Sequence, residues 1–237
     1  MLSSWLFPRG KVCAWCHRQL RHQGDFCRRC RQELQSWVGA YHPCRYCGRL
    51  VPLDREPFCR QCREAKPVFQ KARAAGPYRG LLKAMIHSLK YQGRRSLAVP
   101  LAQLLAGVVL DEFNSGRPDL VIPVPLTAAR LQARGFNQAE LLARALAAEL
   151  GLSLAAKALS RVKETAPQIN LSRRQRWENL RDAFRVVEAE LINGSFVLLV
   201  DDVLTTGATA SACTQALLAA GAANVIAVTL ATGVEDC

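Results

Sequence analysis

The chain has 237 residues, half of them hydrophobic, which is enough for one medium-sized domain with its own core and a small attached module. Its net charge of +13 is uneven, because residues 1–75 hold 15 Lys and Arg against 5 Asp and Glu, and residues 76–237 hold 17 against 14. No apolar run is long enough to cross a bilayer, and the N-terminus lacks the basic and apolar regions of a secretory signal. We therefore expect no membrane insertion and a reducing, cytoplasmic setting.

Eight of the ten cysteines form four Cys-x-x-Cys pairs within the first 62 residues. Each pair places two sulfur atoms on one tight turn, and two such turns ten or eleven residues apart can surround a metal ion with four thiolates. The second group repeats the first at an offset of 31 to 32 residues, which indicates a zinc ribbon written twice and favours consecutive over interleaved sites. We expect two structural Zn²⁺ ions, one held by Cys13, Cys16, Cys27 and Cys30 and one by Cys44, Cys47, Cys59 and Cys62.

Other uses of these cysteines agree less well with the sequence. Four disulfides would need an oxidising compartment, for which the chain shows no export signal. A thioredoxin-like redox pair occurs singly beside a βαβ unit and not in four copies. Spacing alone does not separate zinc from an iron–sulfur cluster. His17, His22 and His42 could each replace a cysteine, but four cysteines per site make no histidine ligand necessary.

Arginine and aromatic side chains alternate between the cysteines. Guanidinium groups pair with phosphates and aromatic faces stack on bases, so this pattern favours a surface for single-stranded DNA or another single-stranded nucleic acid. The alternative is that the aromatic side chains form the small cores of the two ribbons. The residues concerned are Trp15, Phe26, Trp37, Tyr41, Tyr46 and Phe58, with Arg28, Arg29, Arg31, Arg45, Arg49, Arg60 and Arg63.

The composition changes between residues 65 and 75, and we expect one domain over residues 1–66 and a second over 67–237. Apolar residues then recur with the period of a helix over 81–89, after turn signals at Gly76-Pro77 and Gly80. Further along, the pattern predicts strands at 120–124, 196–200 and 225–230 and helices at 137–150 and 209–220. Alternating strands and helices predict an α/β domain with a parallel sheet flanked by helices.

The segment 196–209 carries the clearest functional signal, a buried strand followed by two acids and a small-residue loop that opens a helix. The carboxyl end of the strand would present Asp201 and Asp202 where α/β proteins bind ligands. Loop N–H groups and hydroxyls, with the positive end of the helix, can hold a phosphate. Acids for a diol beside a phosphate loop predict a ribose-5-phosphate site, against the alternative of an ordinary acid pair at a turn. The loop consists of Thr205, Thr206, Gly207, Ala208 and Thr209 and is called the TTGAT loop below.

The sequence VLLVDDVLTTGAT resembles the motif with which type I phosphoribosyltransferases bind 5-phosphoribosyl diphosphate (PRPP). In that family the acids contact the ribose hydroxyls and the loop holds the 5′-phosphate. The resemblance therefore implies the first role, and the catalytic one if turnover occurs, for Asp201 and Asp202, and the second for the TTGAT loop. No Walker-type or dinucleotide-binding glycine motif competes with this assignment.

Nearly the whole chain resembles the ComF/GntX family, in which a cysteine-rich ribbon precedes a phosphoribosyltransferase-like domain. The matching segments are LKY-x-G at 89–93, VIPVP at 121–125, RGFNQ at 134–138, and Thr165, Gln168, Arg176 and Asn179. A diphosphate with Mg²⁺ needs cations and N–H donors, which Lys90, Arg134, Asn137 and Gln138 would supply. Asn137 could equally be a helix cap. Arg173, Arg174 and Arg176 would form either a mobile lid or a solvated face.

Two functions from different classes fit this sequence. The ComF resemblance implies a PRPP-binding module in a protein that handles single-stranded DNA during DNA uptake or the use of external DNA, with uptake-machinery proteins as partners. The alternative is an active phosphoribosyltransferase of nucleotide metabolism, although no acceptor pocket is recognisable. A redox or metal sensor acting through the cysteines is a third, weaker hypothesis.

Overall fold

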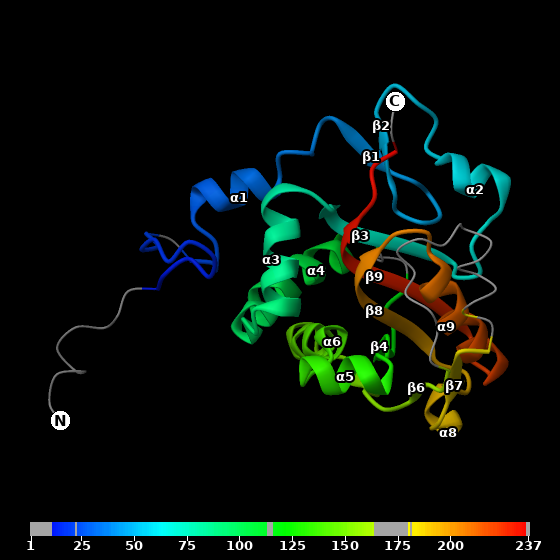
Figure 1. The fold of residues 1–237 in the computed structure, drawn as a ribbon. Helices are drawn as coiled ribbons and strands as arrows, with labels where there is room; N and C mark the ends of the chain where they lie inside the picture. Colours follow the sequence, from blue (N-terminus) through cyan, green and yellow to red (C-terminus); the bar gives the residue numbers. More distant parts are fainter. Residues whose placement is uncertain (1–10, 22, 113–115, 164–179, 181, 236–237) are drawn as a thin grey trace, which may run out of the picture.

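A computed structural model describes residues 11–21, 23–112, 116–163, 180 and 182–235, shown as a ribbon in Figure 1. At its centre, a five-stranded sheet has all neighbouring strands parallel, in the order β3–β9–β8–β4–β5. The central strands are nearly continuous apolar runs because the sheet is covered on both faces. The strands are β3 (Lys71–Pro77), β4 (Leu120–Pro123), β5 (Ser153–Leu154), β8 (Phe196–Leu204) and β9 (Asn224–Thr232).

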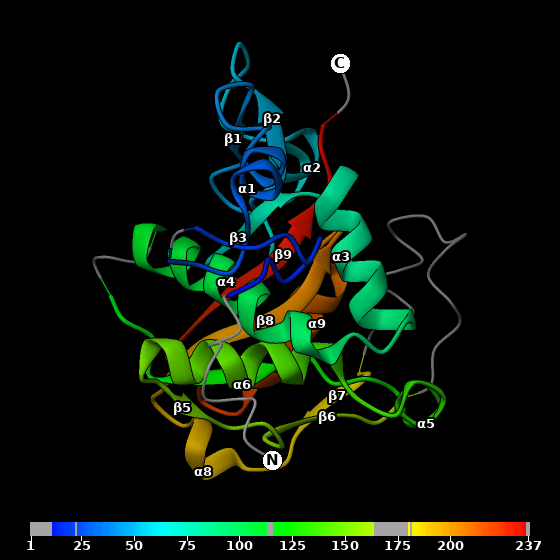
Figure 2. The same ribbon diagram turned by 90° about the vertical axis from the view of Figure 1, so that its left-hand side faces the viewer.

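Two buried clusters, one on each face of the sheet, form the core (Figures 1 and 2). The helices α3 (Gly80–Tyr91), α4 (Ala98–Glu112) and α6 (Gln138–Leu150) share one cluster with Leu198 and Val200. Helix α9 (Ala208–Ala219) shares the other with Val197 and Leu199. Successive side chains of a strand point to opposite faces, so Leu198 and Val200 of β8 face α3 whereas Val197 and Leu199 face α9.

Short elements complete the domain around this sheet. A small antiparallel pair of strands, β6 and β7, joins the α9 face, and α5 follows β4 directly. The bounds are η1 (Arg95–Leu97), α5 (Ala128–Arg134), β6 (Leu159–Arg161), β7 (Phe184–Val186) and α8 (Ala189–Ile192).

The N-terminal part forms two ribbons that pack in different places. The first ribbon (residues 11–35) contains α1 (Arg28–Leu34), and its buried residues belong to the cluster of α3 and α4. The second ribbon (residues 41–64) contains the antiparallel strands β1 (Tyr41–Pro43) and β2 (Leu50–Pro52) and α2 (Arg60–Glu64), and most of its buried residues belong to the α9 cluster. The ribbons therefore extend both core clusters of the sheet domain.

Every strand and helix predicted from residue 81 onward is present, with ends shifted by a few residues. The main difference is β8, which continues through the two acids to Leu204 because β9 remains paired with it there. The edge strand β3 was not predicted, since the Gly76-Pro77 pair at its end was taken only as a turn signal. Its pairing with β9 makes this segment a strand despite that local sequence.

None of the helices in the described part of the chain has the length and hydrophobicity that crossing a bilayer requires.

Candidate functional site

After the neighbouring strands β4 and β8, the chain crosses to opposite faces of the sheet. From β4 the chain returns through α6 on one face to β5, and from β8 it returns through α9 on the other face to β9. Such a switch point opens a crevice at the carboxyl ends of the strands, which is where α/β proteins bind ligands. The pairing of β4 with β8 ends at Pro123 and Val200, so the two acids that follow Val200 lie beyond the end of β4.

A groove of about 760 Å³ opens at this point, and we call it the switch-point groove. Its walls come from α3, α5, α6, β6, β8 and α9 and from loops that include the one after β4, and they carry both acidic and basic side chains. The charged and polar residues that line it are Lys90, Tyr91, Arg130, Arg134, Gln138, Arg161, Asp201, Asp202 and Thr209.

The two acids face opposite sides of the sheet, as the alternation along β8 dictates. Asp202 is 5% exposed and forms an ion pair through Oδ2 with Nζ of Lys90 from α3. Asp201 borders both the groove and a small hollow against α9, and its Oδ1 accepts a hydrogen bond from the backbone N–H of Asp202 at 2.8 Å.

Burial shifts the pKa values of two charged groups in the groove, Asp201 and Lys90. Burial raises the pKa of Asp201 to about 6, although the positive charges of Lys90 and Arg161 oppose the shift. Burial also lowers the pKa of Lys90 to about 8, against the opposing effect of Asp201. Charges removed from water interact more strongly, so a charged ligand bound beside Asp201 and Lys90 would feel them more than in open solvent.

The TTGAT loop turns the end of β8 into α9. Gly207 is the residue before the helix, at φ +76°, a left-handed conformation that glycine adopts without steric cost. Thr206 Oγ1 accepts a hydrogen bond from the N–H of Ala208 at 3.4 Å. Thr209 lines the groove with the acids, whereas 205–208 border the hollow on the α9 side, which Asp201 also lines. The loop and both acids thus adjoin one another.

Of the residues predicted after β4, two line the groove and one does not. Arg134 Nη1 donates to Oε1 of Gln138, and its guanidinium lies 5.2 Å from the ring centroid of Tyr91. Asn137 is the N-cap of α6: its Oδ1 accepts from the N–H of Ala139 at 3.0 Å, and its Nδ2 donates to the carbonyl of Val124 at 3.0 Å. Within the described residues Asn137 therefore has the capping role and positions the loop after β4.

Sequence reasoning missed two cations of the groove. Arg130 precedes Arg134 by one helical turn on α5, a spacing that could have revealed it. Arg161 comes from β6, and nothing in the local sequence distinguishes it from other arginines. The predicted lid and pattern residues Thr165, Gln168, Arg173, Arg174, Arg176 and Asn179 lie outside the described residues.

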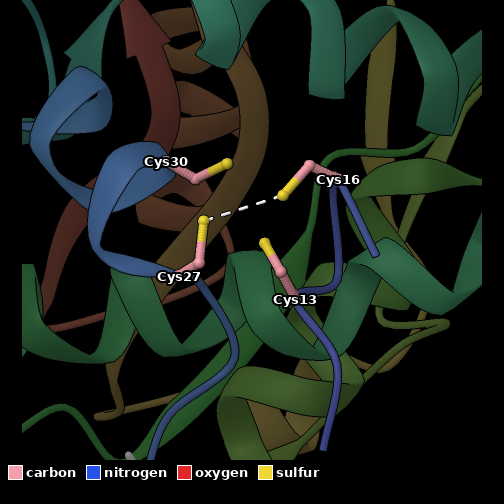
Figure 3. A group of neighbouring side chains, drawn as sticks. All are labelled: Cys13, Cys16, Cys27 and Cys30. Atoms are coloured by element: carbon pink, nitrogen blue, oxygen red, sulfur yellow. Dashed lines mark hydrogen bonds between the residues drawn. The ribbon is translucent and has the colours of Figure 1, made fainter. Parts of the chain in front are cut away.

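The eight predicted cysteine ligands gather in two groups of four, taken consecutively along the chain. Within each group the sulfur atoms lie within 4.8 Å of one another. Figure 3 shows the first group, whose side chains converge, with Cys16 Sγ 3.6 Å from Cys27 Sγ. In the second group the N–H of Cys59 donates to Sγ of Cys44 at 3.4 Å. Four thiolates at this separation fit a structural Zn²⁺ ion, so each group would hold one.

Histidines take no part in these sites within the described residues. His17 Nε2 lies 3.3 Å from Nη2 of Arg94, and His42 Nε2 lies 2.9 Å from the carbonyl oxygen of Arg55. His22 lies outside the described residues.

The aromatic side chains of the ribbons pack against one another, against arginines or against the sheet domain, so they are not open platforms. Phe26 is buried, the other five are partly buried, and the rings of Tyr46 and Phe58 lie 5.3 Å apart. The arginines are the exposed component. A groove of about 380 Å³ on the first ribbon is lined by Arg18, Arg21, Arg28 and Arg29, and none of the four has an ion-pair partner within the described part of the chain.

Comparison with known proteins agrees with this architecture. Residues 101–236 match the phosphoribosyl transferase domain family and residues 2–63 match the double zinc ribbon domain family. The fold and sites thus define a phosphoribosyltransferase-type domain joined to a double zinc ribbon.

Three curated relatives are similar over most of their length. DNA utilization protein YhgH of Salmonella typhimurium is 36% identical over 90% of this chain and 87% of its own. Competence protein F of Haemophilus influenzae is 30% identical over 90% and 93%, and competence protein ComFC of Bacillus subtilis is 27% identical over 89% and 85%. The chain belongs to the ComF family.

Proposed function

We propose that this chain binds PRPP, or ribose 5-phosphate, in the switch-point groove and takes part in handling single-stranded DNA. One observation carries the first half of the proposal: two acids and the TTGAT loop adjoin each other at the carboxyl end of β8, beside a groove lined with cations. Acids suit a ribose diol, the helix start suits the 5′-phosphate, and cations suit a diphosphate.

The charges of the groove suggest where each part of PRPP would lie. The 5′-phosphate would lie at the TTGAT loop and the ribose hydroxyls at Asp201 and Asp202. The diphosphate would lie toward Lys90, Arg130 and Arg134, which line the same groove. Mg²⁺ prefers carboxylate and phosphate oxygens, so the ion would accompany the diphosphate at the acids. Lys90 would then exchange its ion pair with Asp202 for ligand oxygens.

The DNA half of the proposal rests on the relatives and on charge. The relatives are named for DNA utilization and competence, and the first ribbon carries a groove of four arginines without acidic partners among the described residues. Phosphate contacts from arginine are the main sequence-independent source of affinity for nucleic acid. We propose single-stranded DNA as the ligand of this groove, proteins of a DNA-uptake machinery as partners, and the cytoplasm as the location.

Calorimetry with PRPP and Mg²⁺ tests the ligand. We expect the wild type to bind and the double variant Asp201→Asn/Asp202→Asn to lose binding, because the ribose and metal contacts of both carboxylates disappear. Circular dichroism should show an unchanged fold. Asp111→Asn, an exposed acid on α4, serves as the control and should bind like the wild type. Equal affinity of the double variant and the wild type would remove the assigned site.

Turnover is a second candidate function, favoured by the cations where a leaving diphosphate would lie. In such a reaction the bond between the anomeric carbon and the diphosphate oxygen breaks, the diphosphate leaves with the electron pair, and the acceptor bonds to that carbon and loses a proton. Lys90, Arg130 and Arg134 would stabilise the departing charge, and no nucleophilic side chain is needed. Release of diphosphate from PRPP when acceptors are added supports catalysis, and binding without release supports a ligand-binding module.

A further inference from the structure

The second ribbon touches the TTGAT loop directly. Arg49, which lies between Cys47 and β2, donates from Nη2 to the carbonyl oxygen of Thr205 at 2.7 Å, across 156 residues of sequence. The same Nη2 lies 3.5 Å from Oε1 of Gln61 in the ribbon itself. The ribbon therefore places a charged donor on the backbone of the loop that would hold a phosphate.

Further residues of the same two parts border a common hollow. It is lined by Cys47 and Cys62 of the second zinc site and by residues 204–206 of the loop. Phe69, which follows the ribbon and is 2% exposed, lines the same hollow, and a Cβ atom at Gly207 would lie 3.5 Å from its ring. The loop therefore lies against the second zinc site and the residues that follow that site.

The second ribbon is itself fixed to the sheet. Its Leu50 donates to the carbonyl of Gly233 at 3.1 Å and accepts from the N–H of Glu235 at 2.8 Å. Ala72 of β3 donates to the carbonyl of Tyr46 at 2.7 Å. Arg73 of β3 donates through Nη1 to the carbonyl of Cys44 at 3.1 Å. These bonds tie the second ribbon to β3 and to the residues that follow β9, so the segment that carries Arg49 is held against the sheet domain.

A hydrogen bond to a backbone carbonyl also fixes the orientation of the N–H group in the same peptide unit. The carbonyls of Leu204 and Thr205 both have partners, since Thr232 Oγ1 donates to Leu204 at 3.2 Å and Arg49 to Thr205. In a trans peptide the N–H of the next residue points opposite to the carbonyl, so these two bonds set the direction of the amides of Thr205 and Thr206. Amides oriented before binding cost less free energy to order around a phosphate.

The first ribbon has a different attachment. Arg94, after α3, donates through Nη2 to the carbonyl of Ala14 at 3.1 Å, and α1 packs against α3. No hydrogen bond joins the first ribbon to the TTGAT loop within the described residues. The two ribbons, similar in sequence, therefore contact different parts of the sheet domain.

We propose that Arg49 is a positioning residue for the TTGAT loop, and that the second zinc ribbon is a structural part of the phosphoribosyl site. Phosphate binding and zinc binding at Cys44, Cys47, Cys59 and Cys62 are then coupled, and by linkage each strengthens the other. The coupling to ligand rests on the proposed function, whereas the positioning of the loop does not.

The test uses Arg49→Ala in the full zinc-loaded chain, with Arg60→Ala as the matched control. Arg60 lies in the same ribbon, and its side chain pairs only with Glu64 at 3.2 Å among the contacts that the structure describes. Hydrogen exchange of residues 204–208 without ligand, affinity for ribose 5-phosphate by calorimetry, and zinc content are measured on each. Arg49→Ala should speed amide exchange in the loop and weaken ribose 5-phosphate binding about tenfold, as loss of a charged hydrogen bond would. Arg60→Ala should match the wild type, and both should retain two zinc ions.

Arg49→Lys keeps the charge and should restore part of the protection, which separates positioning from general loss of folding. Wild-type exchange rates at 204–208 in a zinc-loaded Arg49→Ala variant would overturn the positioning role. Absence of ribose 5-phosphate and PRPP binding by the wild type would instead overturn the proposed function, and the exchange measurement would still decide the role of Arg49.

For the coupling, PRPP should slow chelator-driven release of the second zinc ion in the wild type and not in Arg49→Ala. Equal release rates would overturn the coupling.

Discussion

Asp201 and Asp202 are adjacent in sequence but lie in different surroundings. Asp202 has a cation within ion-pair distance, whereas Asp201 has a backbone donor and borders the hollow that the TTGAT loop lines on the α9 side. The alternation of a strand separates them, because two successive residues cannot face the same side of a sheet. A ligand that contacts both must therefore reach around the end of β8, which the early end of β4 allows.

The raised pKa of Asp201 predicts a pH-dependent effect of Asp201→Asn on stability. Between its ordinary value of 3.8 and about 6 the folded state binds more protons than the unfolded state, so ionisation of Asp201 removes stability as pH rises. Asp201→Asn should therefore stabilise the fold by up to about 3 kcal/mol at pH 7.5 and by about half as much at pH 5. Urea unfolding at both pH values measures this difference. An equal effect at the two pH values would contradict the shift, and exposed Asp54→Asn should change little at either.

At the scale of elements, the contact of the second ribbon with β3 depends on one close approach. Gly48 has φ +71°, and a Cβ atom there would lie 2.5 Å from the carbonyl oxygen of Ala72. The next residue, Arg49, carries the contact to the TTGAT loop. The backbone of the ribbon at Gly48 thus lies directly against the backbone of the edge strand β3, and any side chain at Gly48 would force the two apart.

Gly48→Ala should destabilise the protein more than Gly39→Ala. Both positions have positive φ, so both lose about 1 kcal/mol to backbone strain. Only Gly48 also has a backbone oxygen within contact distance, because nothing lies within 4 Å of a Cβ at Gly39. We expect an additional loss of about 1–3 kcal/mol from overpacking. Thermal unfolding of the two variants measures it, and equal midpoints would show that the ribbon is not held against β3 as described.

The elements that local sequence determines were predictable, and those that depend on distant partners were not. The β8–loop–α9 unit was predicted because an apolar run, two acids and a glycine turn all lie within a few residues. Strand β3 was not, because pairing with β9, some 150 residues further on, decides its conformation. For the same reason the groove residues Arg130 and Arg161 and the contact from Arg49 to the loop became visible only in three dimensions. The eight cysteine ligands followed from their spacing, and the repeat favoured consecutive over interleaved sets, which is how the structure groups the sulfur atoms.

At the scale of the whole molecule, the open arginine groove is separate from the proposed phosphoribosyl site. That groove lies on the first ribbon, which packs against α3 and not against the TTGAT loop. This separation would let the chain hold a sugar phosphate and a nucleic acid at the same time. Because both ribbons belong to the core clusters, point substitutions test this better than removal of residues 1–66.

Arg28→Ala/Arg29→Ala on α1 should weaken binding of single-stranded DNA and reduce its salt dependence. If each arginine neutralises one phosphate, the slope of log affinity against log salt should fall by about 1.4 in magnitude. The matched control is Arg60→Ala/Arg63→Ala on α2, in the repeated ribbon, which should retain the wild-type slope. Fluorescence anisotropy with a labelled oligonucleotide over 50 to 200 mM salt gives the slopes. An equal fall in both variants would argue against a site on the first ribbon.

The strand order has a consequence for synthesis on the ribosome. Strand β9 lies between β3 and β8, so the first strand of the sheet to be made meets its partner only after the final strand of the described chain has emerged. The bonds from Leu50 to Gly233 and Glu235 await the same event. If the ribbons bind zinc as they emerge, the nascent chain still exposes an unpaired β3 edge until β9 has been made, and pairing over so long a separation is slow. We therefore expect an interval in which the second ribbon is metallated but not yet docked on the sheet, and we expect the chain to be most prone to aggregate in that interval.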